Sequence, residues 1–189
     1  MQRLEPESNH RLRLAAHWIT RGGLVAYPTE AVYGLGCHPQ DEDALRRVIQ
    51  CKKRSPRKGL ILIAWDWHQL LPFVEPLSAA QMQSIFASWP GPYTWLLPAR
   101  SGVSQWLRGD HETLAVRITA HPLARALCRI SGTALVSTSA NRTGQLPART
   151  ALQVRRRLSG WDYLLAGPCG GRNRCSPIRD GRTGELLRV

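Results

Sequence analysis

A run of five consecutive apolar residues, Leu60 to Ala64, most constrains what this chain can fold into. The run has the length of a strand, and it lacks the polar alternation of a strand with one face in solvent. Continuous apolar runs are typical of strands that are buried on both faces of a sheet. The run therefore predicts a buried central strand that other elements cover on both sides.

Helix-like and strand-like segments alternate along the rest of the chain. One helix is expected between a cap at Ser8-Asn9 and a stop at Gly22-Gly23, and a second helix begins at Asp41. Further helices are expected over 78–88, 121–130 and 150–158, and strands over 24–27, 60–64, 93–97, 113–118, 134–136, 162–165, 175–179 and 185–188. The alternation predicts an α/β fold: a single domain over residues 1–189, with a twisted, mixed parallel and antiparallel sheet flanked by helices.

Positive charge is the unusual feature of the composition. Lysine and arginine number 26 against 13 acids, which gives a formal net charge of +13. Such an excess favours an anionic partner such as nucleic acid or nucleotide, and predicts a basic concave cleft. The competing interpretation is that a GC-rich genome raises the arginine content. The chain shows no secretory signal, no apolar run of the roughly 20 residues that a membrane helix needs, and no paired cysteine motif. We therefore expect a cytoplasmic protein without a membrane partner.

A turn after the first expected strand is one candidate site. Tyr27-Pro28 ends the strand, and Thr29 and Glu30 follow, before Gly34 and Gly36. Ligands of open α/β sheets bind beyond the carboxyl ends of strands. A strand-turn-strand in which the glycines serve only the geometry is the alternative.

A basic loop from Lys52 to Lys58 is the second candidate, with five cations in seven residues. It could clamp a triphosphate or an RNA backbone. It could equally be a solvated cluster at a helix C-terminus, where cations are favourable.

Later polar residues complete the candidate set. Arg117 shares one strand face with Thr113, and a buried arginine needs a carboxylate or phosphate partner, from the protein or from a ligand. Strand alternation sends Ser137 and Ser139, and with them Asn141, toward one side, where they could line a polar site or cap turns. A glycine-rich loop over 170–177 brings Ser176 and arginines that could meet an anion.

The motifs that the chain lacks narrow the chemistry. There is no Walker A motif and no G-x-S-x-G elbow, and the histidines show no metal-ligand spacing. The candidate sites are rich in cations, hydroxyls and glycines and poor in acids. That inventory suits binding and neutralisation of an anionic transition state, without a protein nucleophile or a protein-bound metal.

Taken in order, these segments resemble the YrdC-like, or TsaC-type, family of threonylcarbamoyl-AMP synthases. The resemblance runs over nearly the whole chain. It is carried by Tyr27 to Gly36, the basic loop leading to Gly59-Leu60-Ile61-Leu62-Ile63, Trp89-Pro90-Gly91-Pro92 with Thr94, Leu114 to Arg117 with His121-Pro122, Ser137 to Asn141 with Gly144, and Ser176 with Arg188.

The resemblance implies a nucleotidyltransferase. L-threonine and bicarbonate would form a carbamate that attacks the α-phosphate of ATP, with Mg²⁺ accompanying the triphosphate. The product, L-threonylcarbamoyladenylate, would pass to a downstream tRNA threonylcarbamoyl transferase complex that modifies adenosine next to the anticodon, and tRNA itself is a possible partner. Threonine would be held by Thr29, Arg117, Ser137 and Ser176, and ATP by Lys52, Arg54, Thr113, Ser139, Asn141 and Arg188.

Two departures and two rival functions stand beside this resemblance. Ser55 follows Arg54 where the family often has proline, and Ile63 stands where longer relatives carry histidine. A non-catalytic module that binds double-stranded RNA or tRNA, in RNA or ribosome maturation, is the main alternative. A carbamoyl-transfer module of the kind found in hydrogenase-maturation enzymes ranks last, because those chains are long and carry zinc-finger-like cysteines.

Overall fold

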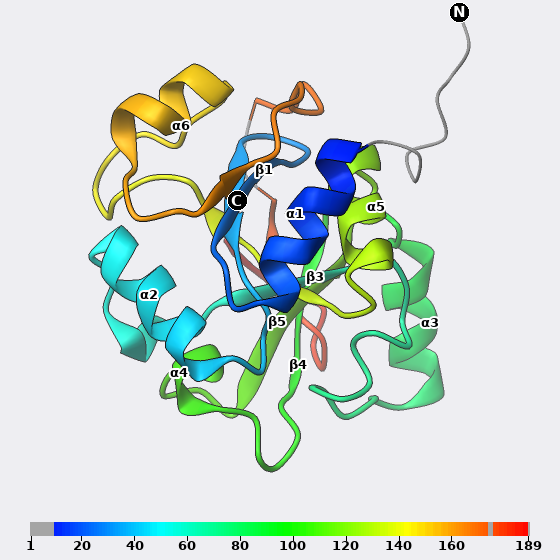
Figure 1. The fold of residues 1–189 in the computed structure, drawn as a ribbon. Helices are drawn as coiled ribbons and strands as arrows, with labels where there is room; N and C mark the ends of the chain where they lie inside the picture. Colours follow the sequence, from blue (N-terminus) through cyan, green and yellow to red (C-terminus); the bar gives the residue numbers. More distant parts are fainter. Residues whose placement is uncertain (1–9, 174–175, 189) are drawn as a thin grey trace, which may run out of the picture.

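The computed structural model describes residues 10–173 and 176–188 and shows helices on the outside of paired strands (Figure 1). The expected cap at Ser8-Asn9 lies outside the described residues. The helices are α1 (His10–Thr20), α2 (Glu42–Lys52), the 3-10 turn η2 (Pro56–Lys58), α3 (Ala79–Ala87), α4 (Gln105–Arg108), α5 (Pro122–Ile130) and α6 (Ala151–Arg157). The strands are β1 (Val25–Pro28), β2 (Tyr33–Gly36), β3 (Ile61–Ala64), β4 (Thr94–Pro98), β5 (Thr113–Ile118), β6 (Leu135–Val136), β7 (Thr138–Ser139), β8 (Tyr163–Leu164), β9 (Ile178–Asp180) and β10 (Leu186–Arg188).

Helix starts follow the capping residues that the sequence offers. The Asp41 side chain accepts a hydrogen bond from the Ala44 N–H at the start of α2, over 2.9 Å. Ser78 and Gln81 form a reciprocal capping box at α3, and Thr150 caps α6. Each cap satisfies backbone donors that a helix start leaves without partners. The short helix α4 was not expected from the sequence.

The strands form two mixed sheets. One has the order β7-β2-β1-β8 and the other β10-β9-β4-β5-β3-β6. β1 is antiparallel to β2 and parallel to β8, while β3 is parallel to β5 and antiparallel to β6. The prediction of an α/β fold with mixed pairing is confirmed, and the strands divide between two sheets instead of joining one.

The chain passes from one sheet to the other at Ser137. β6 pairs with β3 in the larger sheet and β7 pairs with β2 in the smaller one, and Ser137 is the one residue between them. The Ser137 N–H donates to the Ile61 carbonyl, and the Val136 N–H donates to the Cys37 carbonyl. On either side of this crossover, the ends of β1 and β5 lie close together, since Arg117 contacts Glu30.

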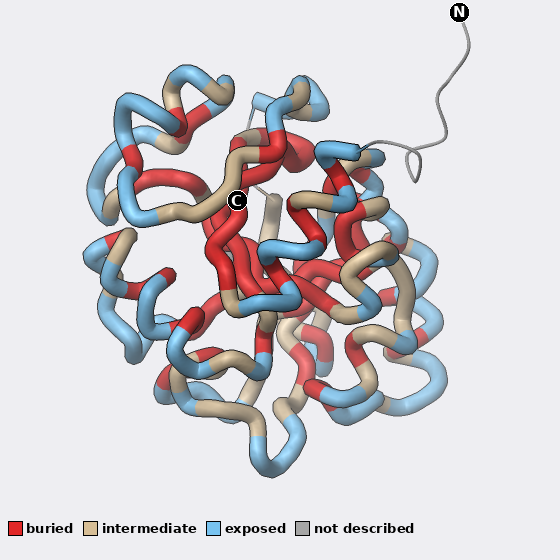
Figure 2. The backbone as a smooth tube through the Cα atoms, viewed as in Figure 1, coloured by how far each residue is buried: buried red, intermediate tan, exposed pale blue. Residues whose placement is uncertain are grey.

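The core is built from both sheets together (Figure 2). One apolar cluster combines Leu35 of the smaller sheet with Leu62 and Val116 of the larger one. A second combines Tyr27 with Ile63 and the buried face of α1 and α5. In β3, Leu62, Ile63 and Ala64 are buried, as their apolar run predicts.

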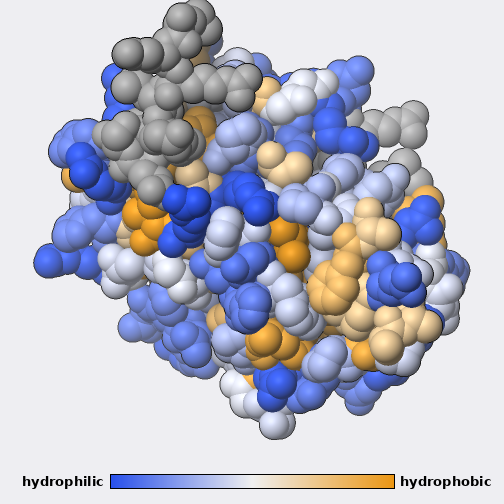
Figure 3. All heavy atoms as spheres, turned by 90° about the vertical axis from the view of Figure 1, so that its right-hand side faces the viewer, coloured by the Kyte–Doolittle hydropathy of each residue, from blue (hydrophilic) through white to orange (hydrophobic). Residues whose placement is uncertain are grey.

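The face that carries α3 and α5 is covered mostly by hydrophilic residues, with smaller hydrophobic areas between them (Figure 3). Phe86 of α3 is 41% exposed and meets Trp67 edge-on, with ring centroids 5.5 Å apart. Within the described part of the chain, every helix is too short or too polar to span a bilayer.

Candidate active site

Hydroxyl groups and two arginines line a cavity of about 340 Å³, which we call the hydroxyl cavity. Such a volume is within the range of small-molecule sites. The sequence-predicted residues that line it come from five places in the chain: the β1–β2 turn, the segment after α2, β5, the β6–β7 crossover and the approach to β9. They are Thr29, Arg54, Arg117, Ser137, Ser139 and Ser176.

The β1–β2 turn holds Thr29 in a fixed orientation. Its N–H and its hydroxyl both donate to the Val32 carbonyl, over 3.1 and 2.7 Å. A Cβ at Gly34 would lie 3.1 Å from the Ser137 Oγ and 3.3 Å from the Thr29 Cγ2. The absence of a side chain at Gly34 therefore allows the turn to pack closely against the crossover.

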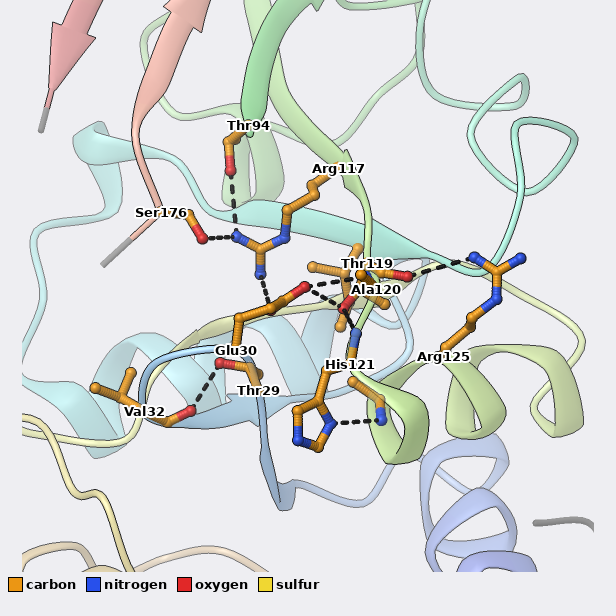
Figure 4. A network of polar contacts seen from close by, with 12 residues as sticks. Thr29, Glu30, Val32, Thr94, Arg117, Thr119, Ala120, His121, Arg125 and Ser176 are labelled. Atoms are coloured by element: carbon orange, nitrogen blue, oxygen red, sulfur yellow. Dashed lines mark hydrogen bonds and ion pairs between the residues drawn. The ribbon is translucent and has the colours of Figure 1, made fainter. Parts of the chain in front are cut away.

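Arg117 lines the hydroxyl cavity and is 5% exposed, and its guanidinium lies among Thr94, Ser176 and Glu30 (Figure 4). Its Nη1 donates to the Ser176 hydroxyl and, over 3.4 Å, to the Thr94 hydroxyl. Its Nη2 lies 3.5 Å from the Oε2 of Glu30. Of the two partners that the sequence left open for this arginine, a protein carboxylate or a ligand, the structure supplies the carboxylate.

Glu30, which the sequence placed in the candidate turn without a role, is the carboxylate partner of Arg117. Its Oε1 accepts hydrogen bonds from the Thr119 hydroxyl over 2.7 Å and from the Ala120 N–H over 3.1 Å (Figure 4). Burial alone would raise the pKa of this carboxyl, but Arg117 and these hydrogen bonds outweigh it and hold the pKa below its ordinary value. The available signal was the scarcity of acids together with the position of Glu30 beside Thr29.

A second cavity, of about 370 Å³, adjoins the first and is lined largely by apolar side chains. We call it the apolar cavity. Thr113, a predicted ATP ligand, lines it, as do Leu96, Leu114 and Ile178. The two cavities share Arg54, Leu60 and Ile61. Arg54 is thus placed to reach a ligand that occupies both cavities.

The loop that carries Arg54 has a defined path despite Ser55. Lys53 ends α2 in a left-handed conformation with φ of 48°, and η2 follows. The Arg54 guanidinium donates to the Gly59 carbonyl over 2.9 Å, and the Asp110 N–H donates to the Arg57 carbonyl over 3.1 Å. The first bond closes the loop on itself, and the second ties its 3-10 turn to the segment after α4.

Lys52 does not line either cavity. It is 3% exposed, and its Nζ donates to the main-chain carbonyls of Ser139 and Asn141, the latter over 2.8 Å. Burial, assisted by the nearby Arg54, lowers the pKa of Lys52 to about 8. In this structure Lys52 supports the segment that carries Ser139, whereas the sequence suggested a direct contact with phosphates.

Of the two remaining predicted residues, Asn141 does not line either cavity, and only the backbone of Arg188 is described. β7 ends at Ser139, so strand alternation does not extend to Asn141. The Asn141 amide instead donates to the Arg142 and Gln145 carbonyls, over 2.9 and 2.8 Å. Arg188 pairs with Ile178 through its backbone in β10, and its side chain lies outside the described part of the structure.

Cations and hydroxyls, with a single carboxylate, set the chemistry of this region. The described residues contain no group of three or more histidine, cysteine, aspartate or glutamate side chains able to hold a metal ion. The Glu30 carboxylate offsets the charge of Arg117, so the basic concave cleft stays a prediction. The arrangement can bind and orient a polar, anionic ligand without forming a covalent bond to it.

Fold and site together define a mixed α/β protein with a hydroxyl-lined cavity between its two sheets. A family model for Sua5, YciO and YrdC proteins, described as "Telomere recombination", matches residues 17–189. This match covers most of the chain, and the chain belongs to the Sua5/YciO/YrdC family.

Relatives named threonylcarbamoyl-AMP synthase are similar over nearly their full length. The protein from Nitrosococcus oceani is 58% identical over 181 residues, which are 95% of this chain and 98% of that protein. The protein from Halorhodospira halophila is 52% identical over 179 residues, or 94% of each chain. A crystal structure of P. abyssi Sua5 complexed with L-threonine has a TM-score of 0.89 at 31% identity; 99% of this chain is covered, and it spans 55% of that longer one.

Proposed function

We propose that the chain is a threonylcarbamoyl-AMP synthase, a nucleotidyltransferase that converts L-threonine, bicarbonate and ATP to L-threonylcarbamoyladenylate and pyrophosphate. The names of the full-length relatives support this activity over a non-catalytic RNA-binding module. One structural observation carries it: Arg117, fixed between Glu30 and two hydroxyls, shares a cavity with Thr29 and Ser137.

The threonine end of the reaction belongs in the hydroxyl cavity. Arg117 binds the carboxylate, because a guanidinium offers several donors in one plane. Thr29, Ser137 and Ser176 surround it with hydroxyls that can bind the amino acid. The amine takes up carbon dioxide from bicarbonate as a carbamate, with loss of water.

The nucleotide end extends from Arg54 into the apolar cavity. The carbamate oxygen attacks the α-phosphorus, and the bond to the β-phosphate oxygen breaks as pyrophosphate leaves. Arg54 is the cation at the junction of the cavities, where negative charge develops. Thr113 contributes a hydroxyl, and Ser139, Asn141 and Arg188 stay proposed ATP ligands. A magnesium ion would accompany the triphosphate and offset part of its charge.

The fate of the product completes the proposal. The adenylate carries an activated carbonyl, so its acceptor is a nucleophile, and the amino group of an adenosine would be one, with AMP as the leaving group. The product passes to a downstream tRNA threonylcarbamoyl transferase complex in the cytoplasm, and tRNA is a possible direct partner of this chain through its net charge of +13.

Pyrophosphate release tests the proposed reaction. We expect release only when ATP, L-threonine and bicarbonate are all present, and little release when L-serine replaces threonine. A release rate that ignores threonine or bicarbonate contradicts the proposal, and mass spectrometry of the adenylate identifies the product.

Arg117→Lys is the first variant to test. Lysine retains the charge but cannot contact Glu30, two hydroxyls and a carboxylate from one plane. We expect threonine binding to weaken by about 2–4 kcal/mol, read as the rise in KM at saturating ATP. Arg100→Lys, at an exposed ion pair with Glu75, is the matched control and should leave KM unchanged. An unaltered threonine KM in Arg117→Lys contradicts the assigned role.

A further inference from the structure

We propose that Glu30 is a positioning residue for substrate recognition, which fixes the Arg117 guanidinium from outside the cavity so that one edge meets the threonine carboxylate. This inference rests on the proposed function and adds to it a residue that makes no contact with substrate.

The contacts of Arg117 divide between its two terminal nitrogens. Nη1 bonds to the hydroxyls of Thr94 and Ser176, and Ser176 is itself a cavity residue. Nη2 faces Glu30, which does not line the cavity and is 7% exposed. Contacts at both nitrogens leave the guanidinium plane little freedom to rotate, so Glu30 determines how the group is presented.

Glu30 is in turn held by the larger sheet. The Thr119 hydroxyl and the Ala120 N–H both bind Oε1, and they follow directly on β5, the strand that carries Arg117 (Figure 4). Oε2 is buried, accepts no hydrogen bond from a described residue, and lies 3.5 Å from Arg117. One carboxylate oxygen is therefore anchored, while the other serves the arginine alone.

The main chain of the same turn also holds the segment 170–172. The Gly170 N–H donates to the Thr29 carbonyl over 3.0 Å, and the Arg172 N–H donates to the Glu30 carbonyl over 3.1 Å. A Cβ at Gly170 would lie 3.0 Å from the Glu30 Cα, so the two segments are in close contact. This contact places the segment that leads to Ser176 beside the residue that orients Arg117.

The charge of Glu30 gives two opposite expectations for threonine binding. If Glu30 merely competes with the substrate carboxylate for Arg117, its neutralisation strengthens threonine binding. If Glu30 positions the guanidinium, neutralisation weakens binding, because the amide of glutamine presents a donor to Arg117 or breaks the bonds to Thr119 and Ala120. The sign of the change separates these cases.

Steady-state kinetics of Glu30→Gln provide the test. We expect the KM for L-threonine to rise by about 10- to 100-fold while the KM for ATP is unchanged. Glu75→Gln, which removes the same charge from the exposed pair with Arg100, is the matched control and should behave as the unaltered chain. A threonine KM that stays constant or falls overturns the proposal, as does an equal rise in the KM for ATP.

Two further variants keep the test decisive if Glu30→Gln does not fold. Thr119→Val removes one bond to Oε1, and Glu30→Asp keeps the charge on a shorter side chain; each should raise the threonine KM above that of the unaltered chain, by less than about tenfold. A threonine KM that is unchanged in both Thr119→Val and Glu30→Asp counts against positioning. If the unaltered chain releases no pyrophosphate, the proposed function fails; an active chain with threonine kinetics indifferent to Glu30 overturns only this inference.

Discussion

Three charged side chains, Glu30, Lys52 and Arg117, are almost wholly buried around the candidate site, with 7%, 3% and 5% of their surfaces exposed. Burial of an ion is unfavourable unless partners replace its hydration. Glu30 and Arg117 replace it with each other and with three hydroxyls, whereas Lys52 has two carbonyl acceptors. The pKa values of Glu30 and Lys52 are both lowered, with opposite meaning for charge: the carboxylate is favoured and the ammonium is disfavoured.

The lowered pKa of Glu30 predicts a loss of stability in acid. A carboxyl whose pKa is lower in the folded chain binds its proton more readily when unfolded, so its contribution is complete above the unfolded value of 4.5 and disappears as pH falls through the folded value. Urea unfolding between pH 3 and 7 should show this fall in the unaltered chain. The free energy of unfolding of Glu30→Gln should fall less over this range. Parallel pH curves for the two proteins would show that the Glu30 carboxylate does not cause the fall.

The lowered pKa of Lys52 predicts a rise of stability in base. Between the folded value of about 8 and the unfolded value of 10.5, the unfolded chain binds more protons, so the free energy of unfolding increases with pH. The full change is about 3 kcal/mol, and it is absent below pH 8. In Lys52→Met, the free energy of unfolding, measured with urea, should rise less between pH 8 and 10 than in the unaltered chain. If the free energy of unfolding changes equally with pH in the two proteins between pH 8 and 10, folding does not lower the pKa of Lys52.

At the scale of elements, local sequence patterns predict where helices and strands lie, but they do not predict which distant elements pack together. Asp41 and Ser78 begin helices because a cap depends only on the next three residues. The partner of Arg117 could not be chosen from the sequence, because Glu30 meets it only after two sheets have packed together. Likewise the period-two pattern at Ser137 assumes one continuing strand, and the change of sheet there is decided by pairing with Ile61 and Cys37.

Close approach of elements at Gly36 predicts a sharp steric limit. A Cβ at this position would lie 2.0 Å from the Val136 carbonyl oxygen and 2.9 Å from the Tyr27 hydroxyl, which itself donates to that carbonyl. We expect Gly36→Ala to destabilise the chain by about 3 kcal/mol or more, measured by urea unfolding, because β2 must move away from β6.

Gly102→Ala is the matched control for this substitution. Gly102 has φ of 89° but open space at its Cβ position, so alanine there costs only backbone strain of about 1–2 kcal/mol. If Gly36→Ala lowers the free energy of unfolding no more than Gly102→Ala does, β2 and β6 can move apart without a measurable loss of stability.

At the scale of the whole molecule, the two sheets are joined by shared apolar clusters. Leu24, Ala26 and Leu35 of the smaller sheet and its approaches lie in one cluster with Leu62 and Leu97 of the larger sheet. The second cluster likewise contains side chains of β1 and of β3. Neither sheet therefore keeps its apolar face covered once the other has unfolded.

This sharing predicts that the chain unfolds as one cooperative unit, as expected of a single domain over residues 1–189. Far-ultraviolet circular dichroism follows the helices, while tryptophan fluorescence sums the signals of all seven tryptophans, of which Trp89 and Trp95 are buried in the cluster that contains the larger sheet. We expect the two signals to give coincident urea transitions, and the calorimetric and van't Hoff enthalpies to agree. Two separated transitions would show that each sheet has a core of its own. The hydroxyl cavity is lined from both sheets. A ligand that binds only the folded chain shifts its single unfolding equilibrium. If the chain is one cooperative unit, threonine should therefore raise the urea midpoint of both signals by the same amount.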